Sequence, residues 1–566
     1  MKRYEVRKPI PKEIQEELAP YSELLQTLLY YRDITTKEAA ERFLNPDFDR
    51  DLHDPFLLPN MDAAVTRIAE AIANNEQVTI YADYDADGVP GAAILSDFFR
   101  KNGFTNFDVY IPHRNREGFG LNKEAVQKIA EAGTTLLITI DCGIADAAEV
   151  SILRERGVDV VITDHHEAHN EIPDAIIVNH KLKTSTYPER ILCGSGVVFK
   201  LVQALIARNV FTHTPGTEKW LLDLVGIATL SDMVPLVGEN RALAHFGLIV
   251  LRKTPRKGLL HLFKKAGTNQ RLITETDVGF SISPRINAAS RMGEPQAAFN
   301  MLATDDDVEA SEHVAHLHHI NDMRKGHVAA IVKAIHKRCE EKDLEACPVI
   351  VMGNPEWQPS LLGLAANSIA EHYRRPVFLW GRGDGTELKG SCRTANGIST
   401  LKIMQGASHM MEAFGGHDQA GGFVVALDKV DLLEDAFIAS YHAAELEKTD
   451  EPTWIDMYLR PEDVSARTYE EMRKLAPFGV GNAEPTFIIQ NVLVKQVEMF
   501  GKTKEHLKLV CHRETGGDLE AISFYTKTDA LTRSCAPGDR RDIVATLDRN
   551  VWGNRQSIRL RLLDVL

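Results

Sequence analysis

Carboxylate and imidazole side chains follow directly on four short apolar runs of this sequence. The residues that end these runs and could bind a metal are Asp83, Asp85, Asp141, His165 and Asp232. If the runs are parallel strands of an open sheet, their carboxyl ends share one edge, where ligands bind. An oxygen-rich set that includes an imidazole suits divalent manganese or magnesium. The sequence therefore predicts a divalent-metal site.

His165 stands beside His166, and neighbouring side chains on an extended strand point to opposite faces. Two histidines alone would be ordinary surface or core residues as readily as ligands. Metal ligation becomes the favoured interpretation because Asp141 and Asp232 are expected at the ends of neighbouring strands.

Three familiar motifs are incomplete in this chain. Residues 83–88 begin like an EF-hand calcium loop, but its twelfth position holds Ile94 and an apolar strand-like run precedes it. His166-Glu167-Ala168-His169 is one residue short of a zinc-protease motif, because Asn170 stands where the second histidine is needed. Gly501-Lys502-Thr503 lacks the upstream glycine of a P-loop. Calcium sensing, metalloprotease activity and ATP-driven chemistry are therefore not indicated.

Composition indicates an ordinary globular protein of several domains. The chain has 566 residues, 44% of them hydrophobic and 26% charged, which favours three or four units. The formal net charge of −15 argues against indiscriminate nucleic-acid binding, which depends on lysine and arginine. Any attraction for nucleic acid would have to be local. The stretch with Lys253, Arg256, Lys257 and Lys264 is one candidate source.

Cysteine usage and hydropathy indicate where the protein works. Its seven cysteines are scattered without a CxxC pair, which fits a reducing compartment. No apolar run approaches the ~18 residues of a membrane span, and the first residues lack a signal-peptide core. We expect a cytoplasmic protein without a membrane partner.

Patterning along the chain predicts an α/β protein of two lobes followed by a β-barrel. Between residues 78 and 232, apolar runs alternate with helical patterns, which indicates βαβ units and a parallel sheet. Residues 305–341 carry apolar positions at mostly helical spacing and predict one long helix. A second α/β pattern follows, and five short strand-like runs near the end favour an OB-fold. The expected parts are a helical wrapper (1–50), a metal-binding domain (51–304), the long helix (305–341), a second α/β domain (342–446) and the barrel (453–566).

Several motifs, taken in order, resemble one family. The residues at 83–88, Asp141-Cys142-Gly143 and Asp164-His165-His166 are similar to the signature motifs of DHH phosphoesterases. Further matches extend the resemblance to RecJ-type single-strand-specific exonucleases over nearly the whole chain. They lie at residues 111–114, 117–120, 194–200, 231–236, 239–241, 284–289, 389–393, 414–417 and 477–485.

The resemblance implies a two-lobed DHH phosphoesterase with a C-terminal OB-fold and two divalent ions, manganese or magnesium. It implies metal ligation by the five residues above, with Asp141 and His166 taking part in catalysis. His166 would touch the scissile phosphate or support a ligand. The residues expected to hold the phosphates of the strand are Arg114, Arg285, Arg291, Ser391, Arg393 and His417.

The chain departs from the family pattern at several places. Pro90 lies where relatives usually carry small hydroxyl residues, although its fixed φ suits the first turn of a helix. Gln358 and Cys392 replace a usual histidine-and-glycine neighbourhood and a usual glycine. These changes affect the expected strand-binding side more than the metal side.

The resemblance predicts a 5′-to-3′ exonuclease that hydrolyses single-stranded DNA with water activated by two metal ions, in DNA repair and recombination. Single-strand-binding protein and a helicase are expected partners of a monomeric enzyme. Two alternatives stay open: a phosphodiesterase for short oligonucleotides or cyclic dinucleotides, and a non-enzymatic replication scaffold. The residues alone leave polarity, the choice between DNA and RNA, and the metal undecided.

Overall fold

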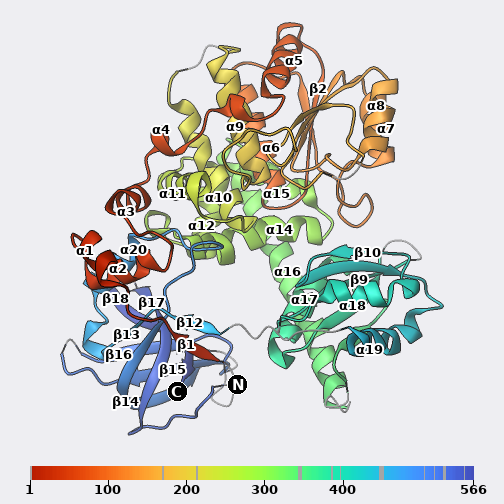
Figure 1. Cartoon of the computed structure of the whole chain (residues 1–566). Helices are drawn as coiled ribbons and strands as arrows, with labels where there is room; N and C mark the ends of the chain where they lie inside the picture. The colour runs from red at the N-terminus through yellow and green to blue at the C-terminus, as the bar shows by residue number, and fades with distance from the viewer. Residues whose placement is uncertain are drawn as a thin grey trace. The chain divides into compact units, whose positions relative to one another are not determined.

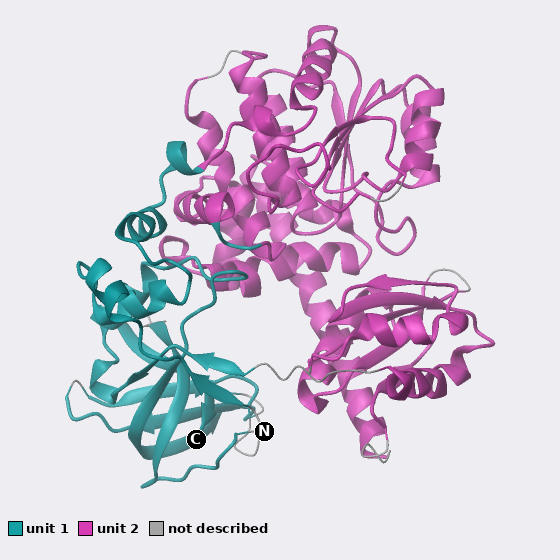
Figure 2. Cartoon of the chain, viewed as in Figure 1, with its two compact units in different colours: residues 1–51, 235–237, 451–566 teal, residues 52–234, 238–450 magenta. Residues whose placement is uncertain are grey.

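The computed structural model describes all of the chain except residues 1–2, 169–170, 212–213, 342–346, 384–386, 396, 445–451, 502–503, 516, 527–530 and 553–554. His169, Lys502, Thr503 and the expected domain boundaries at 342 and 446 lie outside the described residues. The chain divides into two compact units (Figure 2). Unit 1 is Met1–Asp51, Pro235–Val237 and Glu451–Leu566; unit 2 is Leu52–Val234 and Gly238–Asp450.

A five-stranded, all-parallel sheet forms the first lobe of unit 2, in the order β3-β2-β4-β5-β6. Its strands are β2 (Val78–Ala82), β3 (Phe107–Tyr110), β4 (Leu136–Ile140), β5 (Asp159–Thr163) and β6 (Ile176–Val178). All residues of β2 and β4 are buried, as expected for strands covered on both faces. Figure 1 shows α7 and α8 on one side of the sheet and α6 and α9 on the other.

Ten helices of eight or more residues belong to the described part of this lobe before the long helix. They are α5 (Met61–Ala73), α6 (Gly88–Lys101), α7 (Lys123–Glu131), α8 (Ala147–Glu155), α9 (Gly194–Ala207), α10 (Leu222–Ser231), α11 (Gly238–Leu251), α12 (Lys257–Ala266), α14 (Ser283–Arg291) and α15 (Pro295–Ala303). Pro90 occupies the first turn of α6, where a missing N–H costs no intrahelical hydrogen bond.

The run that ends on Asp232 is a helix and not a strand, which corrects the sequence-based prediction. Residues Leu222–Ser231 form α10, and Asp232 is its C-terminal cap. Nearly all of α10 is buried, so its sequence is apolar on every side. A short continuous apolar run is equally consistent with a buried strand and a buried helix, which is why periodicity failed here.

The long helix α16 (Asp307–Glu340) leads from the first lobe to the second, as the apolar spacing predicts. The second lobe has a mixed sheet in the order β10-β11-β9-β8-β7. Its elements are β7 (Ile350–Gly353), α17 (Pro359–Tyr373), β8 (Val377–Arg382), β9 (Leu388–Arg393), α18 (Thr400–Gly406), β10 (Ala413–Gly416), β11 (Ala420–Val425) and α19 (Leu433–Ala443). Phe378 and Phe437 stack in its core at 4.2 Å between ring centroids.

Unit 1 contains a closed barrel of five strands, in agreement with the predicted OB-fold. The ring runs β14-β15-β16-β18-β17 and closes because β14 pairs with both β15 and β17. The strands are β14 (Phe487–Phe500), β15 (His506–Cys511), β16 (Leu519–Ser523), β17 (Arg540–Trp552) and β18 (Arg555–Val565). The short strand β13 (Met457–Leu459) adds to β14, and the helix α20 (Ala466–Arg473) follows it.

The N-terminal segment shares the hydrophobic core of the barrel. Its elements are β1 (Tyr4–Val6), α1 (Lys12–Glu17), α2 (Glu23–Tyr30), α3 (Lys37–Leu44) and α4 (Phe48–Asp51). Leu28 and Leu29 of α2 are fully buried in one cluster with Phe487 and Leu509 of the barrel. β1 also pairs in parallel with β12 (Thr453–Ile455). In the described residues, none of the helices is long and apolar enough to cross a membrane.

Candidate active site

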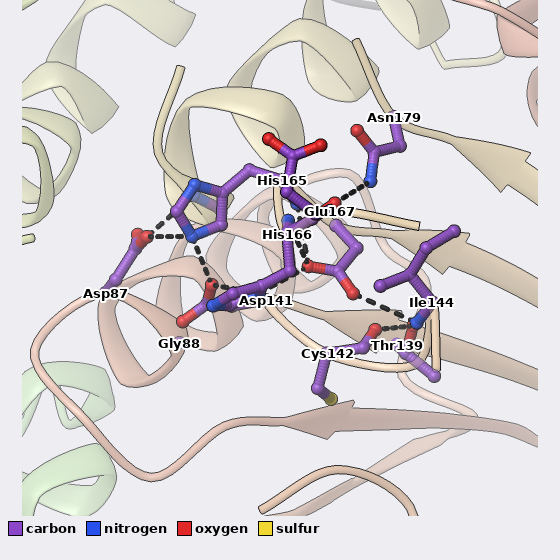
Figure 3. A network of polar contacts seen from close by, with 12 residues as sticks. Asp87, Gly88, Thr139, Asp141, Cys142, Ile144, His165, His166, Glu167 and Asn179 are labelled. Carbon is purple, nitrogen blue, oxygen red and sulfur yellow. Dashed lines mark hydrogen bonds and ion pairs between the residues drawn. The ribbon is translucent and has the colours of Figure 1, made fainter. Parts of the chain in front are cut away.

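The predicted metal ligands meet at the carboxyl edge of the parallel sheet. Asp83 and Asp85 follow β2, Asp141 follows β4, and His165 follows β5. Asp232 reaches the same place from the C-terminus of α10. His165 Nε2 lies 3.1 Å from Asp141 Oδ1 and 3.7 Å from Asp232 Oδ2. Figure 3 shows the His165 ring facing the carboxylates of Asp87 and Asp141.

The donor atoms form sets that fit divalent ions. Three groups have ligand atoms that all lie within 4.8 Å of one another: Asp83 with Asp85 and Asp141; Asp87 with His165 and Asp232; and Asp141 with His165 and His166. Asp83 Oδ1, Asp141 Oδ1 and His165 Nε2 are buried without a hydrogen-bond partner. Buried polar atoms are normally paired, so these atoms fit a site for metal ions. Ligation by the individual residues remains a prediction.

Asp141 is held in a backbone conformation that side chains rarely adopt. Its φ is +62°, and its N–H donates to Thr163 O at 2.9 Å. Aspartate and asparagine tolerate the left-handed region better than most residues. Gly194, the first residue of α9, packs against Asp141, where a Cβ would come within 2.6 Å of the Asp141 Cβ. The carboxylate is therefore fixed by its own strand end and by the start of a neighbouring helix.

Asp87 is a further acidic member of this cluster, although the sequence-based prediction did not include it. Its carboxylate accepts hydrogen bonds from the N–H groups of Gly194 (2.6 Å) and Ser195 (2.7 Å). The N-terminus of α9 stabilises this negative charge. The alternating spacing of three aspartates after β2 was the signal that could have found it.

Asp164 organises the two histidines. Its Oδ1 accepts the N–H groups of His165 (2.7 Å) and His166 (3.1 Å) and lies 2.8 Å from His166 Nδ1. The chain has left the strand at Thr163, so the two rings lie 4.4 Å apart and do not point to opposite faces. Asn179 donates to His166 O at 2.9 Å and holds the same loop (Figure 3).

Burial and mutual repulsion raise the pKa of most acids in the site. Burial, with Asp85 next, raises the pKa of Asp87 to about 6, and burial, with Asp87 next, raises the pKa of Asp232 to about 9. The pKa values of Asp83 and Asp141 are raised well above the usual value, again by burial first and by neighbouring carboxylates next. Burial lowers the pKa of His165 to about 3, so this imidazole is neutral and able to ligate. Bound cations would offset the repulsion among these carboxylates.

Three predicted phosphate-binding arginines gather beside the acidic cluster. Burial, followed by the neighbouring charges of Arg114, Arg324 and Arg393, lowers the pKa of the Arg291 guanidinium to about 9, against the opposing effect of Asp85. Arg291 donates to Ser360 O at 2.7 Å, and the Arg114 guanidinium lies 4.8 Å from the centre of the Tyr84 ring. Like charges held together in a partly buried place favour the binding of an anion.

The second lobe contributes Ser391 and Arg393 from the same face of β9. Arg393 Nη1 lies 3.3 Å from Ser391 Oγ. A Cβ at Gly363 of α17 would come within 2.9 Å of Arg393 Nη2, so this glycine leaves room for the guanidinium. Cys392 points the other way into the hydrophobic core, with its sulfur 3.9 Å from that of Met404. The Cys392 departure therefore does not intrude on Ser391 and Arg393.

His417 and Arg285 are less closely tied to this group. His417 is exposed on the turn between β10 and β11, and β11 pairs with β9. Arg285 of α14 is buried, its Nε has no hydrogen-bond partner, and burial lowers its pKa. Phosphate binding by either residue remains a prediction.

Arg256 is not available to nucleic acid, which corrects one expectation about the basic stretch. It is buried, with its Nη1 2.6 Å from Asp97 and its Nε 3.4 Å from Asp223. Lys257 pairs with Asp307 at 3.5 Å. Arg256 therefore stabilises the first lobe.

Two further residues position the site and were missed by the sequence-based prediction. Asn287 of α14 accepts the N–H of Ala86 at 2.9 Å and so holds the loop that carries the first aspartates. Ser195 donates its hydroxyl to Asp87 O at 2.6 Å. Both residues lie within matched motifs, at 194–200 and 284–289, but hydrogen bonds over such sequence distances leave no local signal of the partner.

Comparison with known proteins agrees with this geometry. Three family models match in chain order: the DHH family N-terminal domain over residues 77–229, the DHHA1 domain over 346–442 and the RecJ OB domain over 455–564. The single-stranded-DNA-specific exonuclease RecJ of Bacillus subtilis (strain 168) is 33% identical over 567 residues, covering 99% of this chain and 70% of the relative. The chain belongs to the RecJ family.

Other RecJ proteins support the assignment. RecJ of Thermus thermophilus is 35% identical over 536 residues, which cover 93% of this chain and 75% of the relative. The crystal structure of RecJ from Thermus thermophilus in complex with Mn2+ matches with a TM-score of 0.82 at 27% identity, covering 100% of this chain and 79% of that one. A crystal structure of exonuclease RecJ bound to manganese is 34% identical and covers 69% of this chain and 96% of its own, with a TM-score of 0.59.

Proposed function

We propose that this RecJ-family protein is a metal-dependent exonuclease that hydrolyses phosphodiester bonds of single-stranded DNA. The observation that carries the proposal is a cluster of carboxylates and an imidazole whose buried donor atoms lack hydrogen-bond partners, beside a group of mutually repelling arginines. A metal site next to an anion site is what hydrolysis of a phosphodiester requires.

We assign different roles in the reaction to the residues of the site. Asp83, Asp85, Asp87, Asp141, His165 and Asp232 would hold two divalent ions. Bound there, manganese or magnesium would supply Lewis-acid stabilisation of the phosphate charge and a nucleophilic water. His166 is oriented by Asp164 through Nδ1, and we assign its opposite nitrogen to the scissile phosphate. Since His166 is closer to solvent than His165, it can meet the substrate.

We further propose that Arg393, Ser391 and His417, with Arg114, Arg285 and Arg291, bind phosphates of the strand. A guanidinium with a hydroxyl beside it suits a terminal phosphate, which an arginine can bind bidentately. Recognition of a 5′-terminal phosphate by Arg393 and Ser391 would make degradation run from the 5′ end.

The barrel would bind the strand by stacking. Phe500 ends β14, His506 begins β15, and Phe524 and Tyr525 follow β16. The His506 ring lies 5.2 Å from Phe500, 5.4 Å from Phe524 and 4.8 Å from Tyr525. Phe524 is 49% exposed and Tyr525 79% exposed. OB-folds bind oligonucleotides on their strands and loops, and exposed rings stack on bases.

One experiment tests the activity and its direction together. Purified protein would be incubated with manganese and with strands labelled at either the 5′ or the 3′ end, single or double stranded. We expect digestion of single strands alone, with the 5′ label released as the first small product and with all digestion abolished by a chelator. Release of the 3′ label first would overturn the polarity, and the absence of metal-dependent digestion would overturn the activity.

The cellular setting follows from the family and is also a proposal. We infer a cytoplasmic monomer that acts in DNA repair and recombination, with single-strand-binding protein and a helicase as partners. In the described residues, none of the seven cysteines forms a disulfide, which suits a reducing compartment. Light scattering would test the monomer, and pull-down with purified candidate proteins would test the partners.

A further inference from the structure

Phe119 is a large apolar side chain that lies in the open beside the metal centre. It is 53% exposed, whereas the lobe around it buries most of its aromatic residues. Its ring lies edge to face against His166, with 5.3 Å between centroids and an angle of 71° between the ring planes. An exposed apolar ring at a reaction centre lacks an obvious role in folding.

The loop that carries Phe119 is fixed on both sides. Gly118 and Gly120 have φ values of +83° and +82°, a conformation that glycine adopts without strain. Gly120 O accepts the buried hydroxyl of Tyr81 at 2.9 Å, and a Cβ at Gly120 would lie 2.6 Å from the Asp146 carboxylate. Asp146 in turn accepts the N–H of Leu121 at 2.7 Å.

The preceding part of the loop is held in the same way. Glu117 accepts the N–H of His113 at 2.5 Å and the hydroxyl of Tyr110, whose ring stacks on Tyr81 at 5.3 Å. Arg114, one of the predicted phosphate-binding residues, lies on this same segment over the ring of Tyr84. The loop thus carries a cation whose charge acts on Asp83 and an aromatic ring that contacts His166, both beside the acidic cluster.

We propose that Phe119 is a nucleobase-binding residue, on which the base of a nucleotide next to the scissile phosphate stacks. One rigid loop thus offers an arginine that can contact the phosphate of a nucleotide and an aromatic ring on which its base can stack. Stacking tolerates every base, because each has a π-face, and an exonuclease must accept each base in turn. The inference rests on the proposed function and names one substrate contact within it.

Strands with a single abasic nucleotide test this contact directly. A series of 5′-phosphorylated strands would carry a tetrahydrofuran residue at the first, second or third position, and kcat/KM would be measured with manganese. We expect one position to slow the wild-type enzyme by roughly 5- to 150-fold, the range for loss of one stacked base. Phe119→Ala should be slowed to a similar degree on normal strands and should lose the sensitivity to that position.

Conservative and control variants separate stacking from support of His166. Phe119→Tyr and Phe119→Trp should keep both the rate and the sensitivity, because they retain a ring. Trp220→Ala removes an aromatic side chain of similar exposure, 44%, from a segment without predicted site residues, and should behave as wild type.

Several outcomes would overturn the inference. If Phe119→Ala slows normal and abasic strands by the same factor and keeps the positional sensitivity, Phe119 only supports His166. If the wild type digests normal strands but is indifferent to abasic residues at all three positions, the base contact is wrong while the proposed function stands. This second measurement needs no variant, so it decides the matter even if Phe119→Ala folds poorly. If the wild type digests no strand, the proposed function fails first.

Discussion

Asp141 is a predicted metal ligand at the centre of the acidic cluster. It belongs to two of the three possible ligand sets, and its Oδ1 has no hydrogen-bond partner. We expect Asp141→Ala and Asp141→Asn to fold and to retain less than about a tenth of wild-type hydrolysis in excess manganese, because metal affinity falls with the lost ligand. Asparagine also tolerates the φ of +62° at this position. A loss of activity in the Asp141→Asn variant would therefore not reflect backbone strain.

A surface aspartate provides the control for Asp141. Asp174 is exposed and pairs with Arg154 at 3.2 Å, so Asp174→Ala should leave the rate unchanged. Metal content by mass spectrometry and melting curves would accompany the kinetics. Activity of the Asp141 variants above a tenth of wild type would remove this residue from the ligands.

His166 should matter for turnover more than for strand binding. Its orientation by Asp164 suits a group that acts on charge developing at phosphorus. We expect His166→Ala to lower kcat by about 10²- to 10³-fold, the usual loss for one such group, with little change in strand affinity. His316→Ala, which removes an exposed histidine paired with Glu294, is the matched control. An unchanged rate with weakened binding would instead assign His166 to positioning the strand.

Arg393 should distinguish the two kinds of 5′ end. A charged hydrogen bond contributes ~1.5–3 kcal/mol, or roughly 10- to 150-fold in affinity. We expect Arg393→Ala to narrow the preference for 5′-phosphorylated over 5′-hydroxyl strands by this factor, whereas Arg382→Ala on β8 should not. Kinetics on both kinds of end would show it. Equal slowing on the two ends would make Arg393 a general backbone contact and would move the end-reading pocket elsewhere.

The carboxyl edge of the parallel sheet brings several buried acids together, and their mutual repulsion opposes ionisation. In the metal-free protein the pKa of Asp87 is raised to about 6 and that of Asp232 to about 9, from the usual 3.8. When the pKa of a carboxyl is higher in the folded state than in the unfolded state, that carboxyl stabilises the fold. This contribution is complete at pH values below the unfolded-state pKa and is lost as pH rises through the folded-state pKa. The contribution of these two carboxyls to the stability of the metal-free protein should therefore fall as pH rises from 3.8, their unfolded-state pKa, to about 9, the folded-state pKa of Asp232.

Magnesium should restore the lost stability, because the bound cation offsets the repulsion among the carboxylates. The effect should be strongest at high pH, where the ligands are deprotonated and can bind the ion. We expect the rise in melting temperature on adding magnesium to be larger at about pH 8.5 than at about pH 6. Asp232→Asn should reduce this difference, and Asp174→Asn should not. Thermal melts at constant ionic strength, with chelator or with magnesium, would measure it. Equal shifts at both pH values would contradict the assignment of these acids to the metal site.

The barrel and the N-terminal segment should fold and unfold as one part. Leu28 and Leu29 are buried against the barrel core, so deleting residues 452–566 alone would expose them. We expect that truncation to aggregate, whereas deletion of both 1–51 and 451–566 should leave a folded nuclease. The double deletion should cleave short strands at near wild-type rate and bind long strands at least about tenfold more weakly, since stacking contributes ~1–3 kcal/mol per base.

Solubility, metal binding and kinetics on strands of two lengths would compare these truncations. A folded double deletion that lost activity equally on short and long strands would show that unit 1 does more than hold the strand.

Three of the five parallel strands, the long helix, the barrel strands and most acids of the candidate site could be predicted from the sequence. Those features are local: an apolar run, a helical spacing, or an aspartate that ends a strand can be recognised within a few residues. The motifs also indicated the family, because their order along the chain can be read directly from the sequence.

Contacts between residues far apart in the chain could not be predicted from the sequence. Asp232 enters the site from a helix and not a strand, and an apolar run buried on all sides carries no period that could tell the two apart. Asp87 is held by the start of α9, Asn287 anchors a loop 201 residues away, and Phe119 meets His166. The N-terminal segment completes the core of a C-terminal barrel. Such contacts arise from packing between elements far apart in the chain, and packing partners leave no trace in local periodicity.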